Sequence, residues 1–153
     1  MQSSVMGQSD IYTSSDQEIL VVIDRGVVDC DQIAEDAPLG AKVLMLDVSR
    51  DAIAQITAAF QQSSFPFASL HLFVNGSPGV LHFASGDFSL KTLDRYADQL
   101  QTWFSYSPSA PNVLNPEIFL YSDRLGTQAA AQELIDTITW LTSATVITAS
   151  LLN

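Results

Sequence analysis

The fold is decided by the stretch Ile19-Leu20-Val21-Val22-Ile23, which is followed at once by Asp24-Arg25-Gly26. The five residues are apolar without alternation, and β-branched side chains dominate them. A strand that is apolar on both faces is typical of a parallel sheet covered by helices. Similar runs are predicted to be further strands, and they lie at residues 42–46, 69–74, 117–121 and 144–149.

Helical patterns separate these runs. Apolar residues recur at helical spacing from Ile53 to about Gln62, and Ser49 is the expected N-cap of that helix. The same spacing predicts one helix over 93–104 and another over 129–141, and a short segment spans 29–37. Strands that alternate with helices predict an α/β fold with a mostly parallel sheet and helices on both faces.

A small β-hairpin interrupts this alternation. Residues 80–83 and 87–90 are joined through Ala84-Ser85-Gly86, which predicts two short antiparallel strands. Residues 1–17 are rich in Ser, Gln and Asp and predict a flexible lead-in. Residues 18–153 are therefore expected to form a single domain, a size that suits one hydrophobic core.

Charge excludes two classes of partner. The formal net charge is -11, from 6 Lys+Arg against 17 Asp+Glu. Such a field repels phosphate backbones and anionic lipids, so nucleic-acid binding is not expected. No apolar run reaches the length of a membrane span, so membrane insertion is not expected either.

The sequence contains one cysteine, Cys30. A single cysteine excludes an intrachain disulfide and a cysteine-based metal cluster.

Acidic residues follow three of the predicted strands. In open α/β sheets, ligands bind beyond the carboxyl ends of the strands. The acids at these positions are Asp24, Asp47 and Asp123. One interpretation is that each carboxylate caps the turn or helix that follows and pairs with a neighbouring arginine. The alternative is a rim that binds a divalent cation or a small ligand. No phosphate-binding glycine loop follows a strand, and no cofactor is expected.

The two histidines have different expected roles. His71 lies inside a predicted strand, which favours a buried, hydrogen-bonded position in the core. His82 alternates with Leu81 and Phe83 in the hairpin, which predicts a position facing solvent. A pair of His71 with Ser122, or a reaction at Asp123, is a third hypothesis, that of a residual hydrolase.

The stretch Leu70-His71-Leu72-Phe73-Val74-Asn75-Gly76-Ser77-Pro78-Gly79-Val80-Leu81 carries a resemblance to a known family. Together with Leu93-Asp94-Arg95-Tyr96-Ala97 it resembles the domain of unknown function 4347 family. That family is found near the N-termini of large bacterial, often cyanobacterial, surface or adhesin-like proteins. The resemblance extends from about 19 to 152 and implies a caspase-like (CHAT-type), doubly wound sheet.

The resemblance also implies where catalytic groups would stand. Members of the family typically carry Ser-His-Gly after the third strand and Tyr-Gly-Cys after the fourth, as in a Cys-His peptidase dyad. Here the two motifs read Val74-Asn75-Gly76 and Tyr121-Ser122-Asp123. A carboxamide at Asn75 does not titrate near neutral pH, and a carboxylate at Asp123 is a weaker nucleophile than a thiolate. We therefore expect that the domain is not an enzyme of this class.

The leading hypothesis is a non-catalytic pseudo-peptidase that acts as a structural or protein-interaction module. It would be a subunit or N-terminal domain of a larger surface assembly, with a protein partner or a second copy of itself. Candidate interaction residues are aromatic or lie in the hairpin, and they are His82, Phe83, Phe88, Trp103, Tyr106 and Trp140. Family resemblance favours the cell surface, whereas the lack of a Sec-type signal peptide in the sequence is equally consistent with the cytoplasm.

Overall fold

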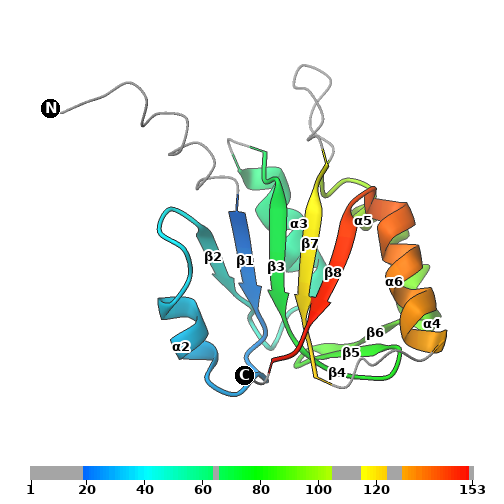
Figure 1. The fold of residues 1–153 in the computed structure, drawn as a ribbon, viewed down its shortest axis with the longest axis horizontal. Helices are drawn as coiled ribbons and strands as arrows, with labels where there is room; N and C mark the ends of the chain where they lie inside the picture. The colour runs from blue at the N-terminus through cyan, green and yellow to red at the C-terminus, as the bar shows by residue number, and fades with distance from the viewer. Residues whose placement is uncertain (1–18, 64–65, 105–114, 124–128, 152–153) are drawn as a thin grey trace, which may run out of the picture.

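A five-stranded parallel sheet forms the centre of the protein (Figure 1). This computed structural model describes residues 19–63, 66–104, 115–123 and 129–151, so the predicted lead-in 1–17 lies outside the described residues. The strands run in the order β2-β1-β3-β7-β8 with every neighbouring pair parallel. Their bounds are β1 Ile19–Ile23, β2 Lys42–Met45, β3 Ser69–Phe73, β7 Glu117–Tyr121 and β8 Thr145–Ala149. The predicted α/β sheet is confirmed.

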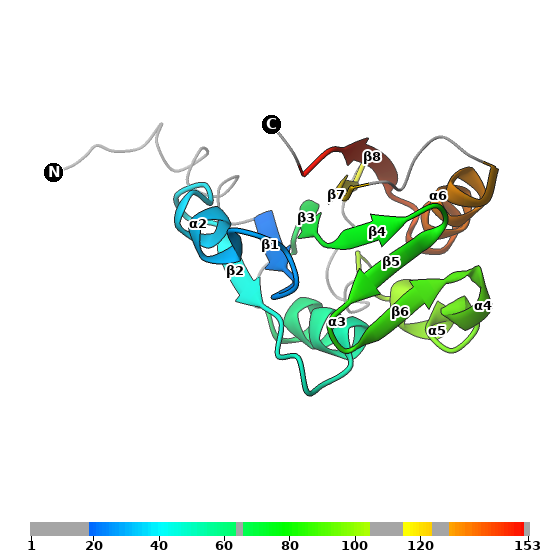
Figure 2. The ribbon, with the colours of Figure 1, turned by 90° about the horizontal axis from the view of Figure 1, so that it is seen from below.

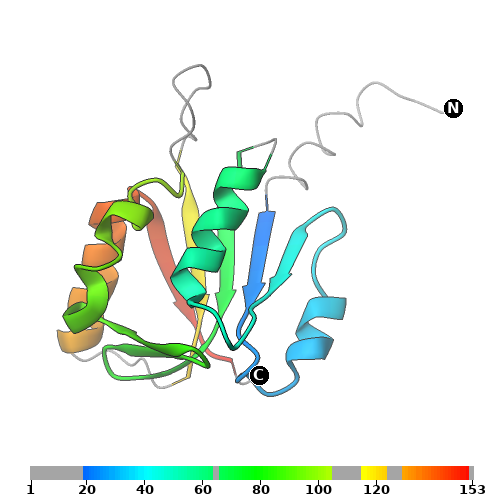
Figure 3. The same ribbon diagram turned by 180° about the vertical axis from the view of Figure 1, so that it is seen from behind.

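Helices cover both faces of the sheet unequally (Figures 2 and 3). The long helices α3 (Ala52–Gln62) and α6 (Ala129–Thr142) pack on one face, whereas the short α2 (Cys30–Glu35) lies on the opposite face against β1. Helices α3 and α6 bury apolar side chains against the sheet, among them Ile56 and Phe60 from α3 and Leu134 from α6. Across the described ranges, no helix has the length and apolar character needed to span a bilayer.

Helix α3 begins two residues later than the predicted N-cap implies. The carboxylate of Asp51 accepts a hydrogen bond from the Ala54 backbone N–H at 3.2 Å, so Asp51 is the N-cap. Ser49 instead donates its hydroxyl to Asp47 Oδ1 at 2.8 Å. The assignment of Ser49 as the cap is wrong, because its side chain already serves the turn after β2.

The predicted helix over 93–104 is also wrong as a single element. Two one-turn helices replace it, α4 (Leu90–Leu93) and α5 (Ala97–Leu100), with a turn between them. Leu93, Leu100 and Trp103 are nevertheless all buried. The apolar spacing correctly indicated which side chains face the core, but it carries no information on whether the backbone hydrogen bonds run without interruption.

A second, antiparallel sheet lies at the carboxyl ends of the parallel strands (Figure 1). It consists of β4 (Asn75–Ser77), β5 (Val80–Phe83) and β6 (Gly86–Ser89). The predicted hairpin is β5 with β6, and β4 adds a third strand. Gly79 turns the chain between β4 and β5 with φ 77°, and a Cβ at this position would lie 2.9 Å from Ala130 Cβ. The turn therefore packs directly on α6.

We expect Gly79→Ala to lower the free energy of unfolding by about 1–3 kcal/mol, because alanine is strained at this φ and its Cβ meets α6. Gly86→Ala is the matched control, since Gly86 has φ 147° but nothing within 4 Å of an added Cβ. Urea denaturation of both variants separates the two effects. Equal losses would show that the contact with Ala130 contributes nothing.

Three of the candidate interaction residues belong to the core. Phe83, Phe88 and Trp103 are 5%, 3% and 4% exposed. Trp103 stacks on Phe60 at a ring-centroid distance of 5.6 Å, and its indole N–H donates to Thr57 Oγ1 at 2.9 Å. The structure thus removes these three from the interaction surface, because an aromatic side chain at helical or strand spacing is drawn to the core by the apolar area it buries.

Candidate functional site at the carboxyl ends of the strands

Asp24 ends β1 and is tied to the backbone on two sides. It is 2% exposed, and its Oδ2 accepts from the Gly26 N–H at 3.0 Å while its Oδ1 accepts from the Ala84 N–H at 3.0 Å. Ala84 lies in the turn between β5 and β6. Oδ2 thus caps the turn after β1, as the first interpretation of the rim predicts, and Oδ1 holds the small sheet against the end of β1. That interpretation also predicts a pairing with a neighbouring arginine, which Asp24 does not form within the described residues.

Asp47 follows β2 and organises the turn that leads to α3. Its Oδ1 accepts from the backbone N–H of Ser49 at 2.9 Å and from the Ser49 hydroxyl. These hydrogen bonds to Ser49, helped by the positive charges of Arg50 and Arg25, hold the pKa of the Asp47 carboxyl below its ordinary value. Asp47 therefore also acts as a local cap.

Asp123 differs from these two acids. It follows β7 and is half-buried, and its Oδ1 is buried without a hydrogen-bond partner. Among the residues that the structure describes, no three His, Cys, Asp or Glu side chains are placed to hold a metal ion. The geometry thus gives the cation-rim alternative no support within that part of the chain.

The ends of β3 and β7 lie side by side. Phe73 is in register with Tyr121, so the residues that follow these strands leave the sheet together. A Cβ on Gly76 would overlap the Ser122 hydroxyl and would lie 3.1 Å from the Asp123 carbonyl oxygen. Asn75 donates its amide N–H to the Gly26 carbonyl at 2.8 Å. Asn75 and Asp123 are therefore carried by adjoining, tightly packed strand ends.

His71 is half-buried on the face of the sheet that α2 covers only in part. Its Nδ1 lies 3.1 Å from the Tyr121 hydroxyl, and its ring stacks on Phe119 at 4.5 Å. Ser122 instead directs its hydroxyl to the Asp123 carbonyl at 3.4 Å. The hypothesised pair of His71 with Ser122 is not formed, because His71 has Tyr121 as its partner. The predicted hydrogen-bonded histidine is found, although it is less buried than expected.

Burial lowers the pKa of His71, and the charge of Glu117 offsets this only in part. The unfolded chain, with a pKa near the ordinary value of about 6.5, then binds more protons than the folded protein below that pH. We expect stability to fall as pH decreases through this window, and His71→Gln to flatten the fall. Thermal unfolding of both proteins between about pH 5 and 7 measures it. An unchanged slope would contradict the shift.

A hydrogen-bonded series that the sequence did not reveal crosses the small sheet. Ser77 Oγ lies 2.8 Å from His82 Nε2, and His82 Nδ1 lies 2.8 Å from Asp87 Oδ1. The order of groups is that of a serine hydrolase triad. Pro78 follows Ser77 and has no N–H, so the backbone donor that commonly stabilises an oxyanion beside such a serine is missing. We interpret the series as a polar ladder that holds β4, β5 and β6 together.

The predicted hairpin contains both His82 and Asp87, but its register was wrong by one residue. A turn at 84–86 would set Phe83 opposite Asp87, whereas β6 begins at Gly86 and His82 pairs with Asp87 in the structure. Ser77 was not foreseeable in the same way, since β4 was not predicted as a strand. The His82 side chain is 41% exposed, and the Trp140 residue is 76% exposed. Tyr106 lies outside the described residues.

Comparison with sequence families finds one match that covers most of the chain. Residues 20–152 match the family described as Domain of unknown function (DUF4347). Comparison with curated proteins finds no match.

Proposed function

Since the chain belongs to the DUF4347 family, we propose that it is a non-catalytic, caspase-like pseudo-peptidase domain that serves as a protein-interaction module. The observation that carries the proposal is the pair Asn75 and Asp123 at adjoining strand ends. These are the positions where the resemblance expects an imidazole and a thiol. Neither replacement can perform that chemistry, because an amide accepts no proton near neutral pH and a carboxylate attacks a peptide carbonyl poorly.

The contacts of these residues support a structural use of the strand ends. Asn75 is engaged with the Gly26 carbonyl at 2.8 Å, and Asp24 holds the neighbouring turn through two backbone amides. Gly76 leaves no room for a larger side chain beside Ser122. The hydrogen bonds of Asn75 and Asp24 thus support a structural role for these two residues in a fold that is retained without catalysis.

An interaction role is supported by the apolar side chains that remain at the surface. Trp140 on α6 is 76% exposed and Ile147 on β8 is 36% exposed. The segment 137–152, which contains both, carries no charged residue. Exposed aromatic residues in an uncharged surrounding are typical of protein contacts. In this proposal, the partner is a second protein or a second copy of this chain, and the domain is part of a larger assembly at the cell surface.

The association is testable by cross-linking in intact cells that make the protein, followed by mass spectrometry. We expect cross-links from the α6–β8 region to a partner or to a second copy. Trp140→Asp should reduce them several-fold, while circular dichroism stays unchanged because the side chain lies outside the core. A domain that yields no cross-links and sediments as a monomer would contradict the interaction role.

A further inference from the structure

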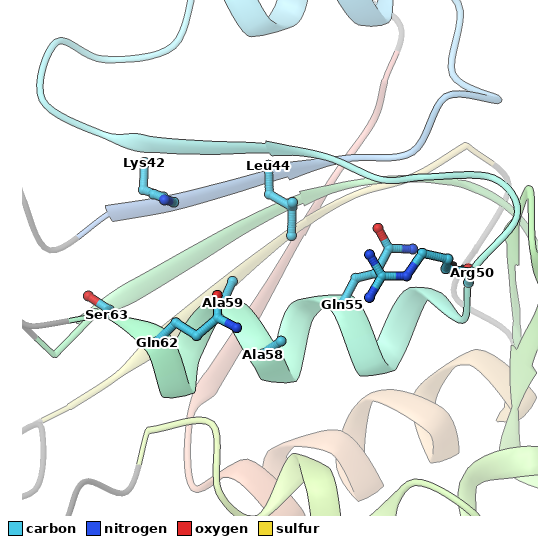
Figure 4. A pocket seen from close by; sticks show the side chains of 8 residues that line it. All are labelled: Lys42, Leu44, Arg50, Gln55, Ala58, Ala59, Gln62 and Ser63. Carbon is cyan, nitrogen blue, oxygen red and sulfur yellow. Dashed lines mark hydrogen bonds between the residues drawn. The ribbon is translucent and has the colours of Figure 1, made fainter.

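An elongated groove lies between the edge strand β2 and helix α3 (Figure 4). Its volume is about 530 Å³, which falls in the range of protein ligand sites. Leu44 from β2 and Ala58 and Ala59 from α3 form an apolar floor. We call this surface, with Lys42 and Arg50, the β2–α3 groove.

The groove has a positive charge at each end. Lys42 lies at the end near the last turn of α3 and Arg50 at the end near its first turn (Figure 4). The whole chain has 6 Lys+Arg against 17 Asp+Glu, so two cations in one groove contrast with the rest of the molecule. Within the described ranges, neither cation has a carboxylate oxygen within 4 Å. Arg50 acts on Asp47 only through its field.

Among the strands that the structure describes, β2 forms the sheet edge beside the groove. β2 is the first strand in the sheet order and pairs with β1. The Leu46 N–H donates to the Ile23 carbonyl at 3.0 Å, and N–H groups alternate in direction along a strand. The N–H groups of Val43 and Met45 therefore point away from β1. An added strand can pair with them, and its alternate side chains would then point toward the α3 side.

We propose that the β2–α3 groove binds an extended, acidic segment of a partner protein, which pairs along β2 and places carboxylates at Lys42 and Arg50. This goes beyond the contact proposed at α6 and β8, because β2 lies at the opposite edge of the sheet, and it rests on the same interaction function. Charge complementarity favours this occupant, because carboxylates are attracted to Lys42 and Arg50, whereas the net charge of -11 opposes the binding of an acidic peptide to the molecule in general.

The test uses the full chain and a fluorescent synthetic peptide in which Glu alternates with Val, followed by anisotropy at low salt. We expect saturable binding that weakens as salt is added. Lys42→Glu and Arg50→Glu should each weaken it by about tenfold, because each reverses one contacting charge. Lys91→Glu is the matched control, since Lys91 is exposed on α4 outside the groove, and it should bind as the wild type does.

A second peptide distinguishes strand pairing from charge attraction alone. Methylation of alternate backbone nitrogens removes the N–H donors that pair with β2 but keeps every carboxylate, and it should abolish binding. The proposal is overturned if the wild type does not bind, if all three charge variants weaken binding equally, or if the methylated peptide binds as well as its parent. The proposal is also overturned if the wild type is a dimer and Lys42→Glu and Arg50→Glu disrupt the dimer without weakening peptide binding. The occupant of the groove would then be a second copy of this chain. None of these results changes the outcome of the cross-linking experiment, so the two proposals can fail separately.

Discussion

Asp24→Ala is expected to lower the free energy of unfolding by about 3–4 kcal/mol, a large share of the stability of a domain of this size. The carboxylate is 2% exposed and accepts from the N–H groups of Gly26 and Ala84. Its removal leaves two backbone donors without their acceptor at the joint between the two sheets. Urea denaturation followed by circular dichroism measures the loss.

Two further variants define the cause. Asp24→Asn keeps one acceptor oxygen but turns an amide N–H toward the other donor, so its loss should be intermediate. Asp94→Ala removes an exposed carboxylate and should change stability by less than about 0.5 kcal/mol. Equal stabilities for Asp24→Ala and Asp94→Ala would contradict the structural role of Asp24.

Replacing Asn75 by His and Asp123 by Cys together is expected to create a reactive thiol. An imidazole beside a thiol stabilises the thiolate and lowers the pKa of the cysteine. The double variant should therefore react with iodoacetamide at about pH 6 roughly tenfold faster than Asp123→Cys alone, a factor that corresponds to about one unit of thiol pKa. Equal rates in the two variants would show that positions 75 and 123 do not face each other.

The central sheet was predictable because its information is local. An uninterrupted apolar run such as 19–23 can only be buried on both faces, and alternation with helices then determines parallel pairing. The break between α4 and α5 was not predictable, since buried residues recur at the same spacing on both sides of it. The prediction of the N-cap of α3 was wrong for a related reason. Ser49 and Asp51 are both residue types that cap helices well, but the hydroxyl of Ser49 is already bound to Asp47.

The candidate site was foreseeable in outline only. In a sheet of this kind, ligand-binding side chains follow the carboxyl ends of the strands. This rule was enough to select Asp24, Asn75 and Asp123 from the sequence. Their partners were hidden because they come from distant segments: Asp24 binds the turn at Ala84, 60 residues further along the chain. The polar ladder was hidden because Asn75-Gly76-Ser77 has little β propensity and becomes strand β4 only by pairing with β5.

We propose that positions 75 and 123 supply neither a proton shuttle nor a sulfur nucleophile for peptide cleavage. The most direct test of this claim is incubation of the purified protein with a mixed peptide library, with the products followed by mass spectrometry. We expect no cleavage above the background of a heat-denatured sample. Cleavage of peptide bonds that is lost on changing Asn75 or Asp123 would contradict the account.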